Sequence, residues 1–251
     1  MKLKHFLIAT IALTQTVALT SCLSSGEDDQ HSAYGYFTVT GNTTEGYTLY
    51  QDGGGTVIPT MSSVSDLTQG KGFQNIERVM LSYTYQDKDI SEDGKSVTGA
   101  KLTAGESYTP LTPISKEVAD SQNILNGDSI FEVANVSHAW AYRGYLNIIY
   151  TAYYAWNEKK NGYLYPTVSL VYDTERMTAT ELNLTLCHNE RRAKGAAPAG
   201  SMSFTECFRL TPLQFAAAAA DTVTCNIGMA GISKPITLKI AREDFVKGNW
   251  R

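Results

Sequence analysis

The sequence has few of the residues on which metal and nucleophilic chemistry usually depend. Its 251 residues include four histidines and four cysteines. No His-x-x-x-His pair, Cys-x-x-Cys pair or Gly-x-Ser-x-Gly elbow occurs, so the usual signatures of zinc sites, dithiol redox sites and serine hydrolases are absent. We therefore predict no metal ion, no cofactor and no catalytic residue, and hence a protein that is not an enzyme. The paired carboxylates of a glycosidase remain an alternative, because their spacing is three-dimensional.

Positive charge and long apolar runs are also scarce. Lys and Arg number 21 against 25 Asp and Glu, which gives a formal net charge of −4. An acidic chain argues against binding to nucleic acid and against electrostatic docking on anionic lipid, both of which need clustered basic residues. The one marked apolar run, residues 6–19, is shorter than the roughly 20 residues that span a bilayer.

That apolar run fits the middle of a secretory signal that ends in a lipidation site. Lys2 and Lys4 precede the run, and Leu19-Thr20-Ser21-Cys22 closes it. An aliphatic residue, two small residues and a cysteine resemble a bacterial lipoprotein signal, in which the Cys22 thiol receives a diacylglyceryl group before cleavage. We expect residues 1–21 to be removed as a signal peptide, leaving 230 residues (251 minus 21) with a net charge of −6, because two lysines are lost. The alternative is a plain signal cut at another small residue, with Cys22 incidental.

Residues 22–33 cannot build a core, and we expect them to form a flexible acidic tether. The cluster Glu27-Asp28-Asp29 lies close to Cys22 and resembles the tag with which some Gram-negative lineages send lipoproteins to the outer leaflet of the outer membrane. The sequence therefore predicts an outer-membrane protein, held in the membrane by its lipid anchor and exposed at the cell surface. The alternative is a solvated spacer that carries no targeting signal.

From Tyr34 onward the sequence is typical of an all-β protein. Short alternating runs rich in Thr, Val and Tyr are separated by Gly, Asn and Asp. Five such runs in residues 34–113 favour a small closed β-barrel, which leaves no exposed edge. The glycines at 53–55 are assigned to a turn, because no lysine and helix follow them as in a phosphate loop. The five predicted strands cover residues 37–39, 47–50, 56–59, 78–85 and 96–102.

Strand signal weakens between residues 110 and 127, where we place a domain boundary. Ser115 is a candidate N-cap for a short helix through Asp120. Residues 114–251 then carry about seven longer strands, the count of a β-sandwich. Thr211 and Pro212 could start a short alanine-rich helix over 213–220. The predicted strands cover residues 130–136, 145–154, 163–172, 181–188, 203–210, 222–227 and 235–241.

An ordered set of segments resembles the NigD-like lipoproteins of anaerobic Gram-negative bacteria. No single motif is specific; the resemblance rests on residues 47–59, 78–83, 128–130, 144–148 and 182–189 in that order, after the lipidation site. It implies an N-terminal OB-like barrel followed by a C-terminal β-sandwich. The family's association with a bacteriocin gene cluster implies an immunity or accessory role. The alanine run and three cysteines depart from the pattern.

Those three cysteines permit one disulfide. Alternation along residues 181–188 and 203–210 places Cys187 and Cys207 on the outer face of a predicted hairpin. They could pair there if their Cα atoms lie within about 7 Å. Cys225 shares a face with apolar neighbours and is assigned to the core. Three reduced thiols are the alternative.

Aromatic residues around a predicted hairpin of residues 145–154 and 163–172 are the candidate ligand contacts, above all Tyr153, Trp156 and Tyr163. Tyr and Trp stack on sugars or peptides and offer a polar group. If Leu146 and Ile148 mark the core face, Tyr150 and Tyr154 are core residues and Tyr153 is exposed. The alternative is that the aromatic residues only fill and rim the sandwich. The full group is Trp140, Tyr142, Tyr145, Tyr150, Tyr153, Tyr154, Trp156, Tyr163 and Tyr165.

Together these features predict a non-enzymatic lipoprotein that binds an extracellular ligand, such as a glycan, or a partner protein. The alternative is a structural, accessory or bacteriocin-immunity subunit that acts only through protein contacts. A concave aromatic patch with convergent polar groups would favour the first function. A flat apolar patch of several hundred Å² would favour the second.

Cys22→Ala is expected to abolish lipid labelling and to release the protein from the membrane, because the acyl chains supply the only membrane affinity that the sequence offers. Metabolic labelling with a clickable fatty acid and fractionation of the membranes measure both effects. Undiminished membrane association of the variant would show that another attachment exists.

Overall fold

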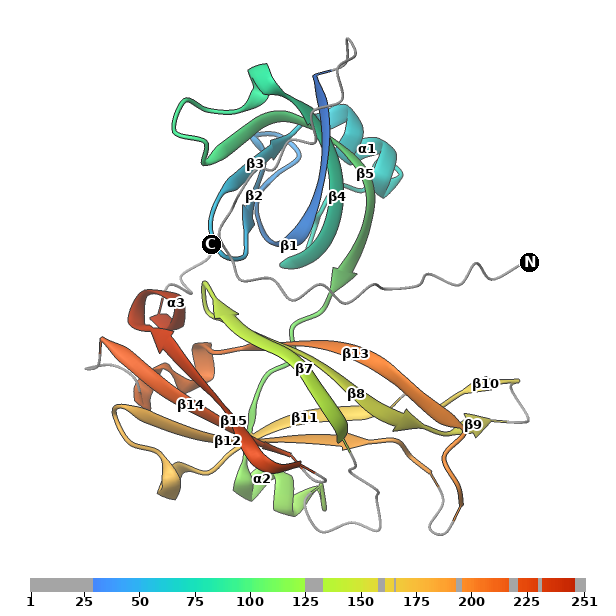
Figure 1. The fold of residues 1–251 in the computed structure, drawn as a ribbon, viewed down its shortest axis with the longest axis vertical. Helices are drawn as coiled ribbons and strands as arrows, with labels where there is room; N and C mark the ends of the chain where they lie inside the picture. The colour runs from blue at the N-terminus through green and yellow to red at the C-terminus, as the bar shows by residue number, and fades with distance from the viewer. Residues whose placement is uncertain are drawn as a thin grey trace.

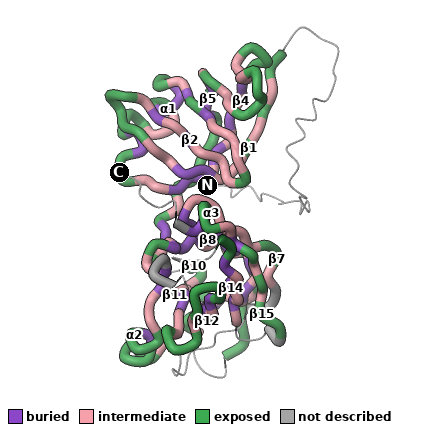
Figure 2. The backbone as a smooth tube through the Cα atoms, turned by 90° about the vertical axis from the view of Figure 1, so that its left-hand side faces the viewer, coloured by how far each residue is buried: buried purple, intermediate pink, exposed green. Residues whose placement is uncertain are grey.

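The computed structural model describes residues 29–124, 133–157, 161–164, 166–192, 196–216, 221–229 and 232–246. Within them, two β domains follow one another along the chain and lie end to end (Figure 1). Buried residues gather along the strands of each domain and again where the domains meet (Figure 2). Among the described residues no helix is long and apolar enough to cross a membrane. The predicted lipidation site at Cys22 and the acidic residues Glu27 and Asp28 lie outside the described residues.

The first domain is the small closed barrel that the sequence predicts. Its strand order is β1-β2-β3-β5-β4. The long first strand closes it, because residues Gln30 to Thr38 pair with β4 and residues Phe37 to Asn42 pair with β2. The turn at Asp52 to Gly55 joins two antiparallel strands, as predicted. The strands are β1 (Gln30–Asn42), β2 (Gly46–Gln51), β3 (Thr56–Pro59), β4 (Arg78–Gln86) and β5 (Ser96–Tyr108).

Two features of the barrel correct the sequence prediction. The strand β1 begins at Gln30, so residues 30–33 are not part of a flexible tether; their backbone pairs with β4, and Ala33 packs against the barrel core. A helix, α1 (Met61–Thr68), joins β3 to β4 and was not predicted. Thr60 caps it by accepting a hydrogen bond from the backbone of Ser63, and Val64 is buried against the barrel core. A Thr cap before apolar residues at helical spacing could have revealed it.

The second domain is a sandwich of a five-stranded and a three-stranded sheet. Their orders are β15-β14-β12-β11-β6 and β13-β8-β7. The first of its strands is β6 (Ile114–Ser115), and α2 (Lys116–Ser121) follows with Ser115 as its N-cap, as predicted. The longer strands are β7 (Val133–Tyr142), β8 (Tyr145–Tyr154), β11 (Thr167–Tyr172), β12 (Glu181–Asn189), β13 (Gly200–Arg209), β14 (Thr222–Met229) and β15 (Ile232–Ala241).

Shorter elements connect these strands. Two of them, β9 (Trp156–Asn157) and β10 (Gly162–Tyr163), pair only with each other. At the predicted alanine-rich helix the chain forms the 3-10 turn η4 (Thr211–Ala216), and residues 217–220 lie outside the described residues. The remaining elements are η1 (Asp87–Asp89), η3 (Thr174–Arg176) and α3 (Arg242–Val246).

Strand pairing in the sandwich differs from the prediction. The predicted hairpin of residues 145–154 and 163–172 is wrong, because β8 pairs with β7 and β13 whereas β11 pairs with β12 and β6. Both strands carry an apolar face, with Ile148 in β8 and Leu170 in β11 fully buried in the same core. An apolar face can pack into this core from either sheet, so alternation alone does not decide which sheet a strand joins.

The positions of the cysteines follow from the same strand pairing. Cys187 lies in β12 and Cys207 in β13, which belong to different sheets, so the predicted hairpin and its disulfide are wrong. Cys187 packs on the outer side of its sheet with Ala119 of α2. Burial raises the pKa of the Cys207 thiol to about 12. Cys225 is fully buried in the sandwich core, as predicted, and all three thiols are free.

Hydrogen-bonded polar side chains connect the two sheets through the sandwich core. The Tyr150 hydroxyl in β8 lies 2.9 Å from Nδ1 of His188 in β12, so a hydrogen bond joins the two sheets. Both residues are completely buried, and Phe204 stacks on the Tyr150 ring. Burial lowers the pKa of His188, which keeps its imidazole neutral near pH 7. Tyr150 is thus a core residue, as the sequence predicts, whereas the same prediction is wrong for Tyr154, which is only half-buried.

Glu206 in β13 lies close to this group, and burial raises the pKa of its carboxyl to about 7. Because the folded state then holds the proton more tightly than the unfolded chain, stability should fall as the pH rises from about 4.5 to about 7. Glu206→Gln should remove this fall, which is on the order of 2–3 kcal/mol. Urea unfolding at pH 4.5 and pH 8 measures it, with the exposed Glu106→Gln as control. An unchanged pH dependence in Glu206→Gln would contradict the assignment.

Candidate functional site

The predicted ligand residues lie at one end of the sandwich. Trp156 and Tyr163 are direct partners in the β9–β10 pair, so their side chains share a face. They are 48% and 36% exposed and rank among the few large exposed apolar side chains of the described chain. We call these two short strands the aromatic arm; Figure 1 shows it at the end of β8, away from the barrel. Tyr154 makes an edge contact with Tyr163, with ring centroids 6.1 Å apart.

Tyr153 is not part of the arm. It lies in β8 opposite Ser201 of β13, and its side chain is half-buried, not exposed as predicted. It occupies the face of β8 opposite to the fully buried Tyr150, as alternation predicts. The structure therefore brings Trp156 and Tyr163 together and leaves Tyr153 beside them in the sheet.

A cluster at the junction of the two domains was not predicted. Arg78, at the start of β4, donates two hydrogen bonds to the Asp52 carboxylate, at 2.7 and 2.5 Å. The side chains of Arg78 and Asp52 are only 2% and 5% exposed. From the sandwich, Trp140 Nε1 donates to Asp52 at 2.7 Å, and the Asn147 amide contacts both charged groups at 3.2 Å. Two residues of the barrel and two of the sandwich thus form one buried network.

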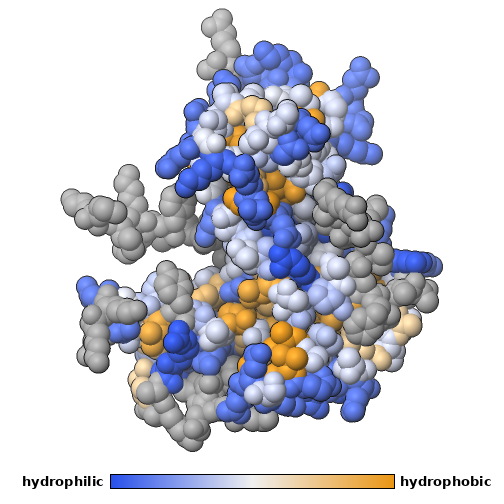
Figure 3. Space-filling view, turned by 180° about the vertical axis from the view of Figure 1, so that it is seen from behind, coloured by the Kyte–Doolittle hydropathy of each residue, from blue (hydrophilic) through white to orange (hydrophobic). Residues whose placement is uncertain are grey.

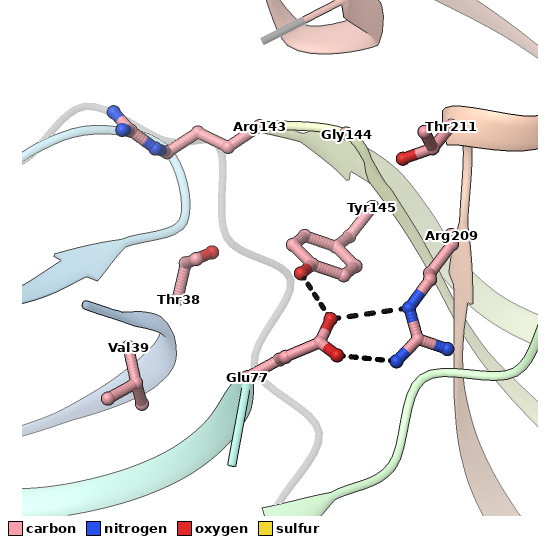
Figure 4. Close-up of a pocket in the computed structure, with 8 residues that line it drawn as sticks. All are labelled: Thr38, Val39, Glu77, Arg143, Gly144, Tyr145, Arg209 and Thr211. Carbon is pink, nitrogen blue, oxygen red and sulfur yellow. Dashed lines mark hydrogen bonds and ion pairs between the residues drawn. The ribbon is translucent and has the colours of Figure 1, made fainter. Parts of the chain in front are cut away.

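A second ion pair lies beside the first. Arg209 of β13 contacts both carboxylate oxygens of Glu77, at 2.6 and 3.3 Å, and the Tyr145 hydroxyl donates to Glu77 at 2.7 Å (Figure 4). Burial alone would raise the pKa of Glu77, but the hydrogen bonds from Arg209 and Tyr145 outweigh it and lower that pKa. The Arg143 guanidinium lies over the Tyr50 ring, 3.9 Å from its centre, and adds a further contact between the domains.

These side chains surround a pocket of about 260 Å³. Ligand pockets usually measure about 300–1,000 Å³, so this one is small. Its carboxylate, Glu77, is already neutralised by Arg209 and hydrogen-bonded to Tyr145. Within the described part of the chain, no group of three or more His, Cys, Asp or Glu side chains could hold a metal ion. The arrangement is suited to holding the two domains in a fixed relation. The lining residues are Thr38, Val39, Glu77, Arg143, Gly144, Tyr145, Arg209 and Thr211 (Figure 4).

Sequence reasoning missed this junction because its residues lie far apart in the chain. Asp52 and Trp140 are separated by 88 positions and Glu77 and Arg209 by 132. Each residue type is also common on β-sheet surfaces. The one local signal is the Glu77-Arg78 pair of opposite charges just before an apolar strand.

Arg78→Met is expected to destabilise the protein by about 3–5 kcal/mol, because it leaves the Asp52 carboxylate buried without its partner. The matched control is Lys116→Met, which removes an exposed ion pair with Asp173 and should cost no more than about 1 kcal/mol. Urea unfolding followed by tryptophan fluorescence compares the two variants. Equal small losses would show that the junction contributes nothing special to stability.

No family model matches the sequence, and no curated protein matches it. Among solved structures, a NigD-like immunity protein from Bacteroides caccae is 18% identical and aligns over 84% of this chain and 92% of its own, with a TM-score of 0.53. A protein from Bacteroides fragilis proposed to be a lipoprotein is 13% identical, with coverages of 84% and 98% and a TM-score of 0.54. A protein of unknown function from Bacteroides vulgatus is 13% identical, with coverages of 84% and 90% and the same TM-score. The predicted resemblance is confirmed at the level of the fold: this chain is an all-β protein with the fold of the NigD-like proteins.

Proposed function

We propose that this protein is a non-enzymatic lipoprotein, anchored in the outer membrane and exposed at the cell surface, that binds a partner protein through its aromatic arm. The observation that carries the proposal is the exposed pair of Trp156 and Tyr163 on neighbouring short strands. Trp and Tyr are the residues most often found at the energetic centre of protein interfaces.

The shape of the arm favours a protein over a glycan. Sites for small ligands are concave and gather several polar groups around the ligand. Trp156 and Tyr163 face outward from a pair of two-residue strands and do not line the pocket at the domain junction. Apolar side chains also gather over the middle of the sandwich when the molecule is seen from behind (Figure 3), a feature typical of surfaces that contact proteins. Tyr153, half-buried beside the arm, takes a flanking position in this proposal.

Two further points support a protein-directed role. One of the proteins with this fold is named a NigD-like immunity protein. Two of the groups whose pKa burial raises most make structural contacts: Tyr150 is hydrogen-bonded to His188 across the sandwich core, and Tyr145 is hydrogen-bonded to Glu77 at the domain junction. An accessory or immunity-type subunit is therefore the form of the proposal that we favour.

The lipid anchor would hold the barrel near the membrane. The first strand begins at Gln30, eight positions after Cys22. A fully extended chain covers at most about 3.6 Å per residue, so the start of β1 lies within roughly 30 Å of the anchored cysteine. The aromatic arm belongs to the other domain, which the buried junction connects to the barrel.

The test is affinity isolation of the tagged full-length protein from solubilised outer membranes. The double variant Trp156→Ala, Tyr163→Ala should weaken capture of the partner by about 30-fold or more, as expected for a loss of at least about 2 kcal/mol at an interface centre. Tyr34→Ala is the matched control, because Tyr34 is a 68% exposed aromatic residue on the barrel. Thermal melts establish that both variants fold. Equal capture by the double variant and the control would refute the role of the arm, and retention on a glycan array instead of a protein would refute the choice of partner.

A further inference from the structure

The barrel holds a second pocket, which shares no residue with the junction between the domains. Its volume is about 390 Å³, within the range of sites for small ligands. The β2–β3 turn and the loop before β5 form its rim, and strands β1, β3, β4 and β5 contribute the walls. We call it the barrel mouth. Its lining includes the side chains of Ala33, Val57, Tyr83, Tyr85, Lys95 and Val97.

Small residues keep the barrel mouth open. Gly53, Gly54 and Gly55 form one side of it with bare backbone, and their φ angles of 86°, 114° and 94° lie in the left-handed region that favours glycine. A Cβ atom placed on Gly54 would meet no atom within 4 Å, so open space lies beside this backbone. On another wall, Ala33 stands directly opposite Tyr83 in the β1–β4 pairing. A larger residue there would fill the space beside the tyrosine ring.

The wall formed by β4, next to Ala33, is aromatic and carries hydroxyl groups. Tyr83 and Tyr85 are 5% and 7% exposed, and their ring centroids lie 5.8 Å apart. Burial raises the pKa of Tyr83 to about 12, so its hydroxyl stays protonated and can donate a hydrogen bond. Within the part of the chain that the structure describes, neither hydroxyl is hydrogen-bonded to another residue, whereas the Tyr145 and Tyr150 hydroxyls both are. Neither hydroxyl oxygen is among the buried atoms that lack a partner, so solvent reaches both, and both residues line the pocket. A ligand in the barrel mouth can therefore accept a hydrogen bond from them in place of water.

We propose that the barrel mouth binds a planar, mostly apolar ring compound that carries an oxygen acceptor. The rings of Tyr83 and Tyr85 and the side chains of Val57 and Val97 contact its faces and edges. A tyrosine hydroxyl donates to its acceptor oxygen, and Lys95 on the rim favours a negative charge on that oxygen. The bare glycine backbone lets a flat molecule approach closely. This site is independent of the aromatic arm, which belongs to the other domain.

The probe is 8-anilinonaphthalene-1-sulfonate, a ring compound with sulfonate oxygens whose fluorescence rises in apolar surroundings. Titration of the full chain should reveal one equivalent of probe bound. Ala33→Phe fills the mouth and should abolish this binding, whereas Ser32→Phe, the matched control on the neighbouring exposed position of the same strand, should leave it unchanged. Tyr83→Phe keeps the ring, removes the donor and should weaken binding by about 5- to 10-fold, as expected for about 1 kcal/mol from one hydrogen bond.

Thermal melts accompany each titration. If Ala33→Phe does not fold, Tyr83→Phe alone decides, and parental affinity in that variant would overturn the proposal. Equal binding by Ala33→Phe and Ser32→Phe in folded protein would also overturn it. The arm variant Trp156→Ala, Tyr163→Ala should bind the probe as the parent does. A failure of the arm in partner capture therefore leaves this test intact, and a failure of probe binding leaves the arm untouched.

Discussion

The ion pair between Arg78 and Asp52 is the interaction on which the arrangement of the molecule depends. Each partner is almost completely buried, and a buried charge is tolerated only when its hydrogen-bonding groups are satisfied. The barrel alone provides Thr38 for Arg78, and the sandwich provides Trp140 and Asn147. Separating the domains would therefore return part of this network to water and leave the rest incompletely paired. The two domains share a polar contact that neither completes by itself.

The position of this pair also links several parts of the barrel. Arg78 opens β4, the strand that pairs with both β1 and β5. Asp52 lies immediately before the glycines of the β2–β3 turn, which form one side of the barrel mouth. A single ion pair thus connects the first residue of β4 to the residue that precedes the glycines of the β2–β3 turn.

The sequence predicted well which segments form strands and poorly which strands lie side by side. Alternation correctly assigned Tyr150 and Cys225 to the core, because it reports which face a side chain occupies. It cannot tell which strand lies alongside, so β8 and β11 were wrongly paired, as were the strands of Cys187 and Cys207. Trp156 and Tyr163 were predicted to lie in one region because they are close in the chain, and they are paired in the structure, while their role in binding stays a prediction. The junction was missed because Asp52, Arg78 and Trp140 come from three distant segments, and no local pattern reports such a meeting.

If Cys22 carries the proposed lipid anchor, the early start of β1 has a mechanical consequence. Any pull between an anchored Cys22 and the rest of the molecule enters the fold at Gln30 and runs along β1. Nine consecutive residues of that strand, Gln30 to Thr38, are paired with β4. Tension directed along the strand would load these hydrogen bonds in shear, so that many must break together. The load then reaches Arg78 at the other end of β4, and through Asp52 and Trp140 it passes into the sandwich.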